Sequence, residues 1–227
     1  MNIPSPCVGR AYQNAGNRPL LEMFANVEPG RILDCGCGAG DNARILQAHG
    51  WSTTGITISV EEQKQAAAFC DRVYLADLNF GIPEEIEGEF DIVLLSHVLE
   101  HLIHPESLLQ SLFRVLKPAG RIAVALPNVM VYSQRLQFLK GRFDYTSTGL
   151  MDETHVRFYT FSTGTSLLEK NGYDLLISRA DGAFPFWKTR RYLPGSWVTA
   201  LNTWATTWRP GLFGSQLLYL AKAGSNG

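Results

Sequence analysis

Three glycines at alternate positions, Gly36, Gly38 and Gly40, separate an apolar run from a helical pattern. The run Arg31–Asp34 predicts a buried strand, and the pattern over Asn42–His49 predicts a helix. Glycine adopts positive φ readily and leaves no Cβ in the path of a ligand. The first turn of a helix also presents N–H groups without an intrahelical partner. The segment therefore predicts a strand–turn–helix unit that could hold a dinucleotide, a flavin or a sulfonium nucleoside against its backbone.

The chain beyond this turn repeats the alternation of short apolar runs and helical patterns, which is typical of a parallel sheet with crossover helices. Further strands are expected at Ser52–Ile58, Val73–Ala76, Phe90–Leu95, Arg121–Leu126, Tyr173–Ser178 and Ser215–Ala221. Further helices are expected at Glu61–Asp71, Ser107–Leu116, Val129–Lys140 and Phe161–Asn171. With 45% apolar residues, the 227-residue chain can bury a sizeable core, which excludes a disordered or coiled-coil protein. We expect one domain over residues 1–227, with a polar, aromatic insertion at about 128–160 and an aromatic, basic insertion at about 182–214.

Charge and cysteine content exclude several classes of protein. The formal net charge of -1 makes nucleic-acid binding through bulk positive charge unexpected. The sequence contains no apolar window of about 18 residues, so we expect no membrane-spanning helix. Residues 1–10 do not have the pattern of a secretory signal. The four cysteines form no CxxC pair, so we expect reduced thiols and a cytoplasmic protein. These cysteines are Cys7, Cys35, Cys37 and Cys70.

The C-terminal segment from Gly182 to Gly227 has an unusual composition. It contains no acidic residue, five basic residues and four of the five tryptophans of the chain. The basic residues are Lys188, Arg190, Arg191, Arg209 and Lys222, and the tryptophans are Trp187, Trp197, Trp204 and Trp208. Basic residues mixed with tryptophan are typical of a surface that lies on anionic lipid. The alternative is a helix whose tryptophan rings cover the sheet or form a dimer contact.

Two details of the glycine turn distinguish between its candidate ligands. Asp41 stands where a dinucleotide fingerprint requires its third glycine, so the GxGxxG pattern is not met and a nicotinamide oxidoreductase is disfavoured. Asp34 ends the strand, and its carboxylate there can pair with an ammonium group of a ligand or steady the loop. Dinucleotides carry no ammonium group, whereas S-adenosylmethionine does.

Five segments in order resemble the class I S-adenosylmethionine-dependent methyltransferases over roughly residues 28–180. They read ILDCGCGAG, GITIS, YLADLN, FDIVLLSHVLEHL and LKPAGRIAVALPN. The resemblance implies an α/β, Rossmann-like fold with a mostly parallel seven-stranded sheet and helices on both faces. It also implies a C-terminal antiparallel hairpin, here Tyr173–Ser178 with Ser215–Ala221, and S-adenosylmethionine as the cofactor.

The same resemblance implies the residues that bind the cofactor. The glycine turn would hold the methionine part, through Asp34, Gly36, Cys37, Gly38 and Gly40. Asp77 and Leu78 would meet the adenine, and Ser96 and His97 would border the sulfonium. The second strand usually ends in an acid that binds the ribose; here Thr57, followed by Ile58, takes that place. The stretch GITISVEEQ is similar to the cyclopropane-fatty-acid synthase branch, and Glu61 or Glu62 is a candidate to replace the missing acid.

A cluster of His97, Glu100, His101 and His104 follows the fourth strand. If this segment is helical, His97 and His101 share a face. An imidazole could act as a general base, or two imidazoles and a carboxylate could bind a divalent metal ion; the third possibility is a purely structural role. The segment is similar to the metal-binding Glu-x-x-Glu-His of ubiquinone-pathway and small-RNA end methyltransferases, with His97 in place of the first acid.

The loop over Gly141–Tyr159 supplies a second candidate base, His155. Arg157 could bind an acidic acceptor, or both residues could pin the loop to the following helix. The run resembles a bacterial branch associated with polysaccharide and other small acceptors, in which this region would form the acceptor pocket.

We therefore expect in-line methyl transfer to an oxygen atom of a small-molecule or glycan acceptor, with His101 or His155 as the base. The alternative is a binding protein. The stretch from ADLNFGIPEEI to PNVMVYSQRLQFLKGRF is similar to methyltransferase-like proteins that assist an acyltransferase of methionine biosynthesis, and such a protein would bind the nucleoside without methylating anything.

Overall fold

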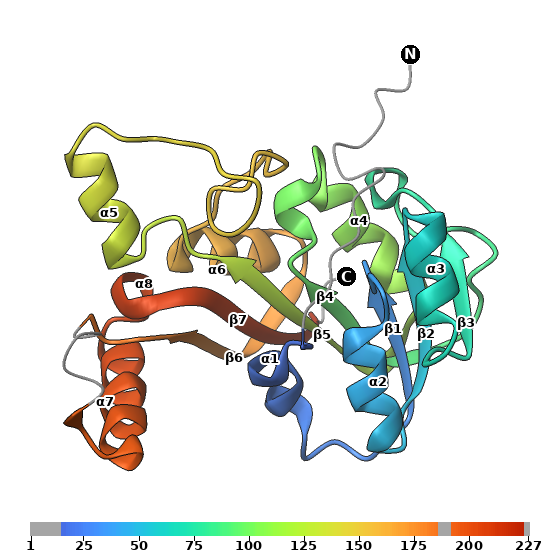
Figure 1. The fold of residues 1–227 in the computed structure, drawn as a ribbon. Coiled ribbons are helices and arrows are strands. Elements are labelled where there is room, and N and C mark those ends of the chain that lie inside the picture. The colour runs from blue at the N-terminus through green and yellow to red at the C-terminus, as the bar shows by residue number, and fades with distance from the viewer. Residues whose placement is uncertain (1–14, 186–191, 225–227) are drawn as a thin grey trace.

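A computed structural model describes residues 15–185 and 192–224 of the chain. Its seven strands are β1 (Arg31–Cys35), β2 (Ser52–Thr57), β3 (Arg72–Leu75), β4 (Phe90–Ser96), β5 (Leu116–Pro127), β6 (Tyr173–Gly182) and β7 (Gly214–Ala223). They form one sheet in the order β3-β2-β1-β4-β5-β7-β6 (Figure 1). The first five strands are parallel, and β7 is antiparallel to both β5 and β6. This arrangement confirms the predicted seven-stranded sheet and its C-terminal hairpin.

Helices cover both faces of the sheet because side chains alternate along each strand. Among the described residues, the α-helices are α1 (Arg18–Leu21), α2 (Asp41–Ala48), α3 (Val60–Ala66), α4 (Pro105–Ser111), α5 (Tyr132–Leu139), α6 (Phe161–Lys170), α7 (Gly195–Trp208) and α8 (Pro210–Phe213). Val93 and Leu95 of β4 pack in the same apolar cluster as Leu108 of α4 and Leu168 of α6. Ile92 and Leu94 point to the other face and pack in a cluster with α1 and α2. The central strands β1, β4 and β5 are largely buried, as their nearly continuous apolar runs predict, whereas the edge strands β3 and β6 are partly exposed.

Two predicted helices end earlier than expected because the following residues form hydrogen bonds to the sheet. The helix expected over Glu61–Asp71 stops at Ala66, and the Asp71 amide already donates to the Thr53 carbonyl of β2. The helix expected over Ser107–Leu116 becomes a 3₁₀ turn at Leu112–Arg114 before Leu116 pairs with Phe90. Hydrogen bonding to a neighbouring strand outweighs local helix propensity at both ends.

The expected helix Val129–Lys140 begins later, at Tyr132. The Asn128 side chain accepts a hydrogen bond from the Met130 amide, and the Val129 amide donates to the Tyr159 carbonyl, so these residues form a turn. Buried Asn128 also donates to the carbonyls of Gly211 and Gly214, at 3.1 and 2.7 Å, which joins the two insertions at the end of β5.

The second insertion contains α7 and α8, which lie at the edge of the molecule in Figure 1. Within the described residues, no helix combines the length and the apolar character that crossing a bilayer requires. Five residues with a predicted role fall outside the described part of the chain: Cys7, Trp187, Lys188, Arg190 and Arg191.

Candidate active site

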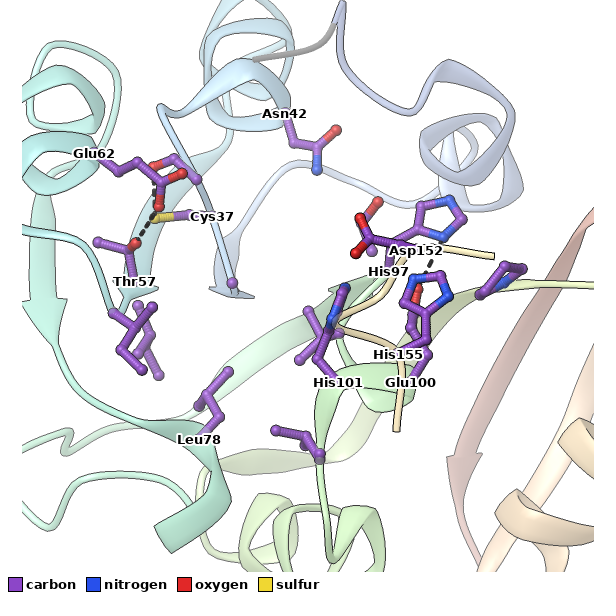
Figure 2. Close-up of a pocket in the computed structure, with 18 of the residues that line it drawn as sticks. Cys37, Asn42, Thr57, Glu62, Leu78, His97, Glu100, His101, Asp152 and His155 are labelled. Carbon is purple, nitrogen blue, oxygen red and sulfur yellow. Dashed lines mark hydrogen bonds and ion pairs between the residues drawn. The ribbon is translucent and has the colours of Figure 1, made fainter. Parts of the chain in front are cut away.

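A cavity of about 570 Å³ opens at the carboxyl ends of β1, β2, β4 and β5. This is the edge where an open parallel sheet binds its ligands, and the reversal of strand order between β1 and β4 places the crevice there. Figure 2 shows two walls, with Cys37, Thr57, Glu62 and Leu78 along one and His97, His101 and His155 along the other. Nine of the eleven predicted cofactor residues line the cavity: Gly36, Cys37, Gly38, Thr57, Ile58, Asp77, Leu78, Ser96 and His97.

The glycine turn takes its shape from positive φ angles and one close approach. Gly36, Gly38 and Gly40 have φ of 77°, 53° and 89°. A Cβ on Gly36 would lie 2.6 Å from Cγ2 of Val98, so glycine is required there by the neighbouring β4 loop as well as by φ. Gly40 does not line the cavity; it precedes α2, and a Cβ there would meet Ala66 at 3.0 Å.

Backbone hydrogen bonds hold three amides of this turn. The Gly36 and Cys37 amides both donate to the Ile56 carbonyl at 2.9 Å, and the Gly40 amide donates to the Cys37 carbonyl.

The Cys37 thiol is buried. Its contact with Cys70 is the larger cause that raises the pKa of Cys37, and burial is the second. Cys37 is therefore a neutral wall of the cavity. Cys35, Cys37 and Cys70 are all free thiols.

Asp34 lies behind the turn and is fully buried, so it does not line the cavity surface. Neither of its carboxylate oxygens has a hydrogen-bond partner. Burial raises the pKa of Asp34 to about 7, and the neighbouring Asn42 amide only partly opposes this. A carboxylate left without partners in the interior is costly, which makes it a candidate to pair with a cationic group of a ligand.

Strand β2 ends without a carboxylate, but the next helix, α3, provides one. Glu62, in the first turn of α3, lines the cavity and is buried. Its Oε2 accepts a hydrogen bond of 2.7 Å from the Thr57 hydroxyl. Ser59 caps the helix by accepting from the Glu62 amide, which fixes the position of the side chain. Glu61, the other candidate, is exposed and faces Lys64.

Asp77 begins the 3₁₀ turn Leu78–Phe80 beside the same wall. Its Oδ1 accepts from the amide and the side chain of Asn79, both at 2.9 Å. Asn79 in turn accepts from the Ile103 amide. The Asp77 carboxylate is thus held in a defined position at the cavity edge.

The histidine cluster differs from the predicted helical face. Only Leu99–His101 is helical, as a single 3₁₀ turn, and His97 lies before it with φ of 59°. The prediction that His97 and His101 share a helical face is therefore wrong, because the chain takes a left-handed conformation at the end of β4. His104 does not line the cavity; it precedes α4 and provides no side-chain cap.

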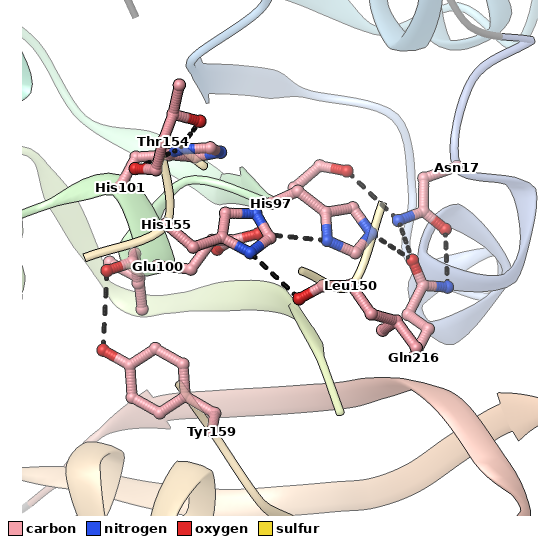
Figure 3. A network of polar contacts seen from close by, with 11 residues as sticks. Asn17, His97, Glu100, His101, Leu150, Thr154, His155, Tyr159 and Gln216 are labelled. Carbon is pink, nitrogen blue, oxygen red and sulfur yellow. Dashed lines mark hydrogen bonds and ion pairs between the residues drawn. The ribbon is translucent and has the colours of Figure 1, made fainter. Parts of the chain in front are cut away.

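His97 forms an ion pair with Glu100. Its Nδ1 lies 3.2 Å from Glu100 Oε1, and its Nε2 lies 2.5 Å from Gln216 Oε1 (Figure 3). Desolvation opposes charge on both residues, but their mutual contact raises the pKa of His97 and lowers that of Glu100. Both ring nitrogens face oxygen acceptors, an arrangement that favours the protonated imidazolium over a free base.

The second histidine pair forms between the loop after β4 and the acceptor-side insertion. The rings of His101 and His155 lie 4.8 Å apart in an edge-on arrangement. His101 Nδ1 contacts the Thr154 hydroxyl and carbonyl, and His155 Nδ1 contacts the Leu150 carbonyl. The Thr154 hydroxyl donates to Asp152, so it accepts from Nδ1 of His101, and the Leu150 carbonyl accepts from Nδ1 of His155. Desolvation lowers the pKa of His155, which favours its neutral form.

Glu100 lies beside His101 and His155. It is fully buried, and its Oε2 has no hydrogen-bond partner. One ligand atom from each of Glu100, His101 and His155 lies within 4.8 Å of the others. Arg157, by contrast, does not line the cavity; it donates to the Ile103 carbonyl and faces Glu106, which pins the loop to α4.

Sequence reasoning missed two residues of this site, Asn17 and Gln216. Their side-chain amides pair with each other across 199 positions, and the Asn17 amide also donates to Ser96. Figure 3 shows this network reaching His97. No local pattern in the sequence marks either residue, because the pairing exists only once β7 lies beside β5.

Comparison with known proteins agrees with this architecture. The family model described as a methyltransferase domain matches residues 9–177. The ubiquinone biosynthesis O-methyltransferase of Psychrobacter cryohalolentis is 31% identical over 128 residues, which are 53% of this chain and 49% of that protein. The human mitochondrial ubiquinone biosynthesis O-methyltransferase is 31% identical over 169 residues, covering 67% of this chain and 45% of that protein. The chain thus spans about half the length of the curated relatives it matches.

Solved structures extend the likeness over the whole fold. A SAM-dependent methyltransferase from Archaeoglobus fulgidus has a TM-score of 0.62 at 20% identity, covering 91% of this chain and 95% of its own. A Burkholderia thailandensis 1,6-didemethyltoxoflavin-N1-methyltransferase has a TM-score of 0.56 at 17% identity, covering 92% and 78%. By its family model, its sheet topology and the glycine turn at the switch point, the chain belongs to the class I S-adenosylmethionine-dependent methyltransferases.

Proposed function

We propose that this protein transfers the methyl group of S-adenosylmethionine to a hydroxyl oxygen of a small-molecule acceptor. The observation that carries the proposal is the pair of imidazoles, His101 and His155, that lines the same cavity as the glycine turn. The relatives named as ubiquinone O-methyltransferases support oxygen as the acceptor atom. The cavity volume of about 570 Å³ is within the usual range for a bound small molecule.

The residues of one cavity wall and of the turn behind it fit the cofactor. Asp34 lies behind the turn with two buried oxygens that have no partner, and an ammonium group of the methionine part that reaches into the turn would supply one. Glu62, held by Thr57, suits the ribose hydroxyls, and Asp77 with Leu78 suits the adenine. We assign Gly40 to the shape of the turn instead of to direct contact.

Cofactor binding should depend on pH through Asp34. The pKa of about 7 in the free protein falls when an ammonium group becomes its partner, so binding releases a proton below pH 7. Affinity for S-adenosylhomocysteine is expected to rise by up to about tenfold per pH unit between pH 5.5 and 7, and to level off above. Calorimetry in buffers of different ionisation enthalpy measures the affinity and the released proton. In Asp34→Asn the slope should vanish; an equal slope in that variant contradicts the assignment.

Glu62 should contribute to cofactor affinity although it lies outside the strand. A Glu62→Gln variant is expected to bind S-adenosylhomocysteine about tenfold more weakly, since it loses a charged acceptor worth about 1.5 kcal/mol. Glu61→Gln is the matched control, because its side chain is adjacent in sequence but exposed. Equal affinities of both variants, measured by calorimetry, would place ribose recognition elsewhere.

The reaction needs one proton transfer, for which His155 is best placed. When bound, the cofactor would supply the methyl group to the acceptor oxygen and keep the electron pair of its broken carbon–sulfur bond. The hydroxyl proton would pass to Nε2 of His155, whose Nδ1 is held by the Leu150 carbonyl. Gly149, Leu150 and Asp152 of the insertion line the cavity beside His155, and this wall would help to keep water from the reacting atoms.

The same cluster fits a divalent metal ion. Glu100, with its unpartnered Oε2, and the two imidazoles would supply three ligands of types that divalent cations accept. When bound, such an ion would lower the pKa of an acceptor hydroxyl. Dialysis against a chelator, followed by elemental analysis of untagged protein and readdition of Mg²⁺ or Mn²⁺, separates this reading from metal-free base catalysis.

A labelled-methyl assay tests the proposed function. The protein is incubated with tritiated S-adenosylmethionine and a cell extract, which is then separated into small-molecule, lipid, glycan and protein fractions. We expect label in the small-molecule or lipid fraction as a base-stable methyl ether. Label in the glycan fraction alone would change the acceptor class. Cofactor binding without label in any fraction, together with a co-purifying acyltransferase, would favour the binding-protein alternative.

A further inference from the structure

The helices α5, α7 and α8 form one continuous edge of the molecule, at the left in Figure 1. Arg135 of α5 donates to the Gly211 carbonyl of α8 at 3.3 Å, and the Tyr132 ring lies 6.4 Å from Phe213. Phe213 in turn stacks with Trp208 of α7 at 6.4 Å. These contacts define what we call the aromatic edge, residues 132–145 and 192–213. It lies at the opposite end of the sheet from β3.

Large apolar side chains on this edge point into solvent. Trp197, Trp204 and Trp208 occur at spacings of seven and four, so they share one face of α7. Their exposed fractions are 68%, 52% and 57%, while Ala205 and Thr206 on the other face are buried. Other members of the edge are also exposed: Leu136, Leu139, Phe143, Tyr145, Tyr192 and Leu193. Exposed apolar clusters of this kind mark interaction sites.

The charge of these segments is strongly one-sided. The aromatic edge contains four basic residues and one acidic residue, Asp144, and α7 itself carries no charge. The remaining residues contain 16 basic and 20 acidic side chains, so the rest of the molecule is negative. Among the basic residues, Arg209 follows α7 directly and lies over the Trp208 ring at 5.3 Å. The four are Arg135, Lys140, Arg142 and Arg209.

This combination selects one kind of partner. Tryptophan places its apolar ring and its N–H at a lipid–water boundary, and arginine and lysine pair with anionic headgroups. A second copy of the chain, docked through the same face, would bring two positively charged surfaces together. We propose that the aromatic edge binds the surface of a membrane that contains anionic lipid, with the tryptophan face of α7 in the headgroup region.

Vesicle binding by the full chain tests this proposal without cofactor or acceptor. We expect cosedimentation with phosphatidylcholine vesicles that contain phosphatidylglycerol, a blue shift of tryptophan emission, and at least tenfold weaker binding to pure phosphatidylcholine. Trp197→Ser and the double reversal Lys140→Glu/Arg209→Glu should each reduce binding about tenfold, since each charge contributes several-fold near such a surface. Phe80→Ser is the matched control, because Phe80 is 73% exposed beyond β3.

Three results would overturn the proposal. The first is equal binding to both kinds of vesicle or to neither. The second is unchanged binding by Trp197→Ser when its circular dichroism and melting temperature match the wild type. The third is a concentration-dependent dimer in light scattering that Trp197→Ser dissociates, which would assign the edge to contact between copies of the chain.

Discussion

Gly36→Val is expected to abolish measurable binding of S-adenosylhomocysteine, with an affinity loss of at least about 100-fold. The variant meets two separate obstacles. Residue 36 has φ of 77°, which a β-branched residue avoids, and its Cβ would lie 2.6 Å from Val98 Cγ2. The side chain would therefore displace the turn from the loop after β4, and both of these segments line the cavity. The sequence alone suggested that a side chain here would fill ligand space; the structure places Val98 there.

The variant Gly141→Val separates the effect of a positive φ from that of the steric contact. Gly141 also has a positive φ, of 70°, but a Cβ there would meet nothing within 4 Å, and it lies outside the cavity. Gly141→Val should bind the ligand normally, while Gly36→Val should not. Calorimetry measures binding, and circular dichroism with thermal melting shows that each variant is folded. Wild-type affinity in a folded Gly36→Val protein would mean that the turn does not shape the cofactor site.

His155→Gln is expected to reduce turnover by about 10²–10⁴-fold, the usual contribution of a general base. The reason is that burial lowers the pKa of His155, although the charges of Glu100 and Asp152 oppose this, so burial favours a neutral imidazole at the cavity. Affinity for S-adenosylhomocysteine should stay within about twofold, since His155 lies on the wall opposite Thr57 and Glu62 (Figure 2). The measurement is single-turnover formation of the labelled product found in the extract assay.

The control for His155→Gln is Arg157→Gln, two residues along the same loop. Arg157 pins the loop to α4 from outside the cavity, so its loss tests whether loop position alone explains the effect. We expect that control to change turnover by less than about tenfold. Equal losses in both variants would reduce His155 to a positioning role, and His101→Gln would then be the next variant to test as the base.

The strand–turn–helix unit at Asp34–Asp41 could be predicted because its determinants are local. Apolar residues in a short run, glycines at positive φ and a helix start all act over about ten residues. The order of such units also predicted the parallel sheet, whereas the antiparallel hairpin was expected from the resemblance to class I methyltransferases. Boundaries were predicted less well where two tendencies competed, as at Asp71 and Leu116, which join the sheet although they continue a helical pattern.

The sequence supplied candidate residues for both walls, but the arrangement of the histidines required the structure. Thr57 and Glu62 are five positions apart, so the sequence could propose them together, but only the hydrogen bond between them selects Glu62 over Glu61. The positive φ of His97 separates it from His101, and the loop carrying Thr154 and His155 supplies the partner of His101 instead.

Residue types and local spacing thus determined the fold class and the cofactor turn of this protein. The tertiary structure alone decided that His97 pairs with Glu100, that His155 joins His101, and that the side chains of Asn17 and Gln216 pair beside His97. The physical reason is the separation along the chain over which each effect acts. Backbone conformation and hydrophobic periodicity act between near neighbours, whereas the protonation state of a side chain depends on desolvation and charges from segments that meet only after the sheet has formed.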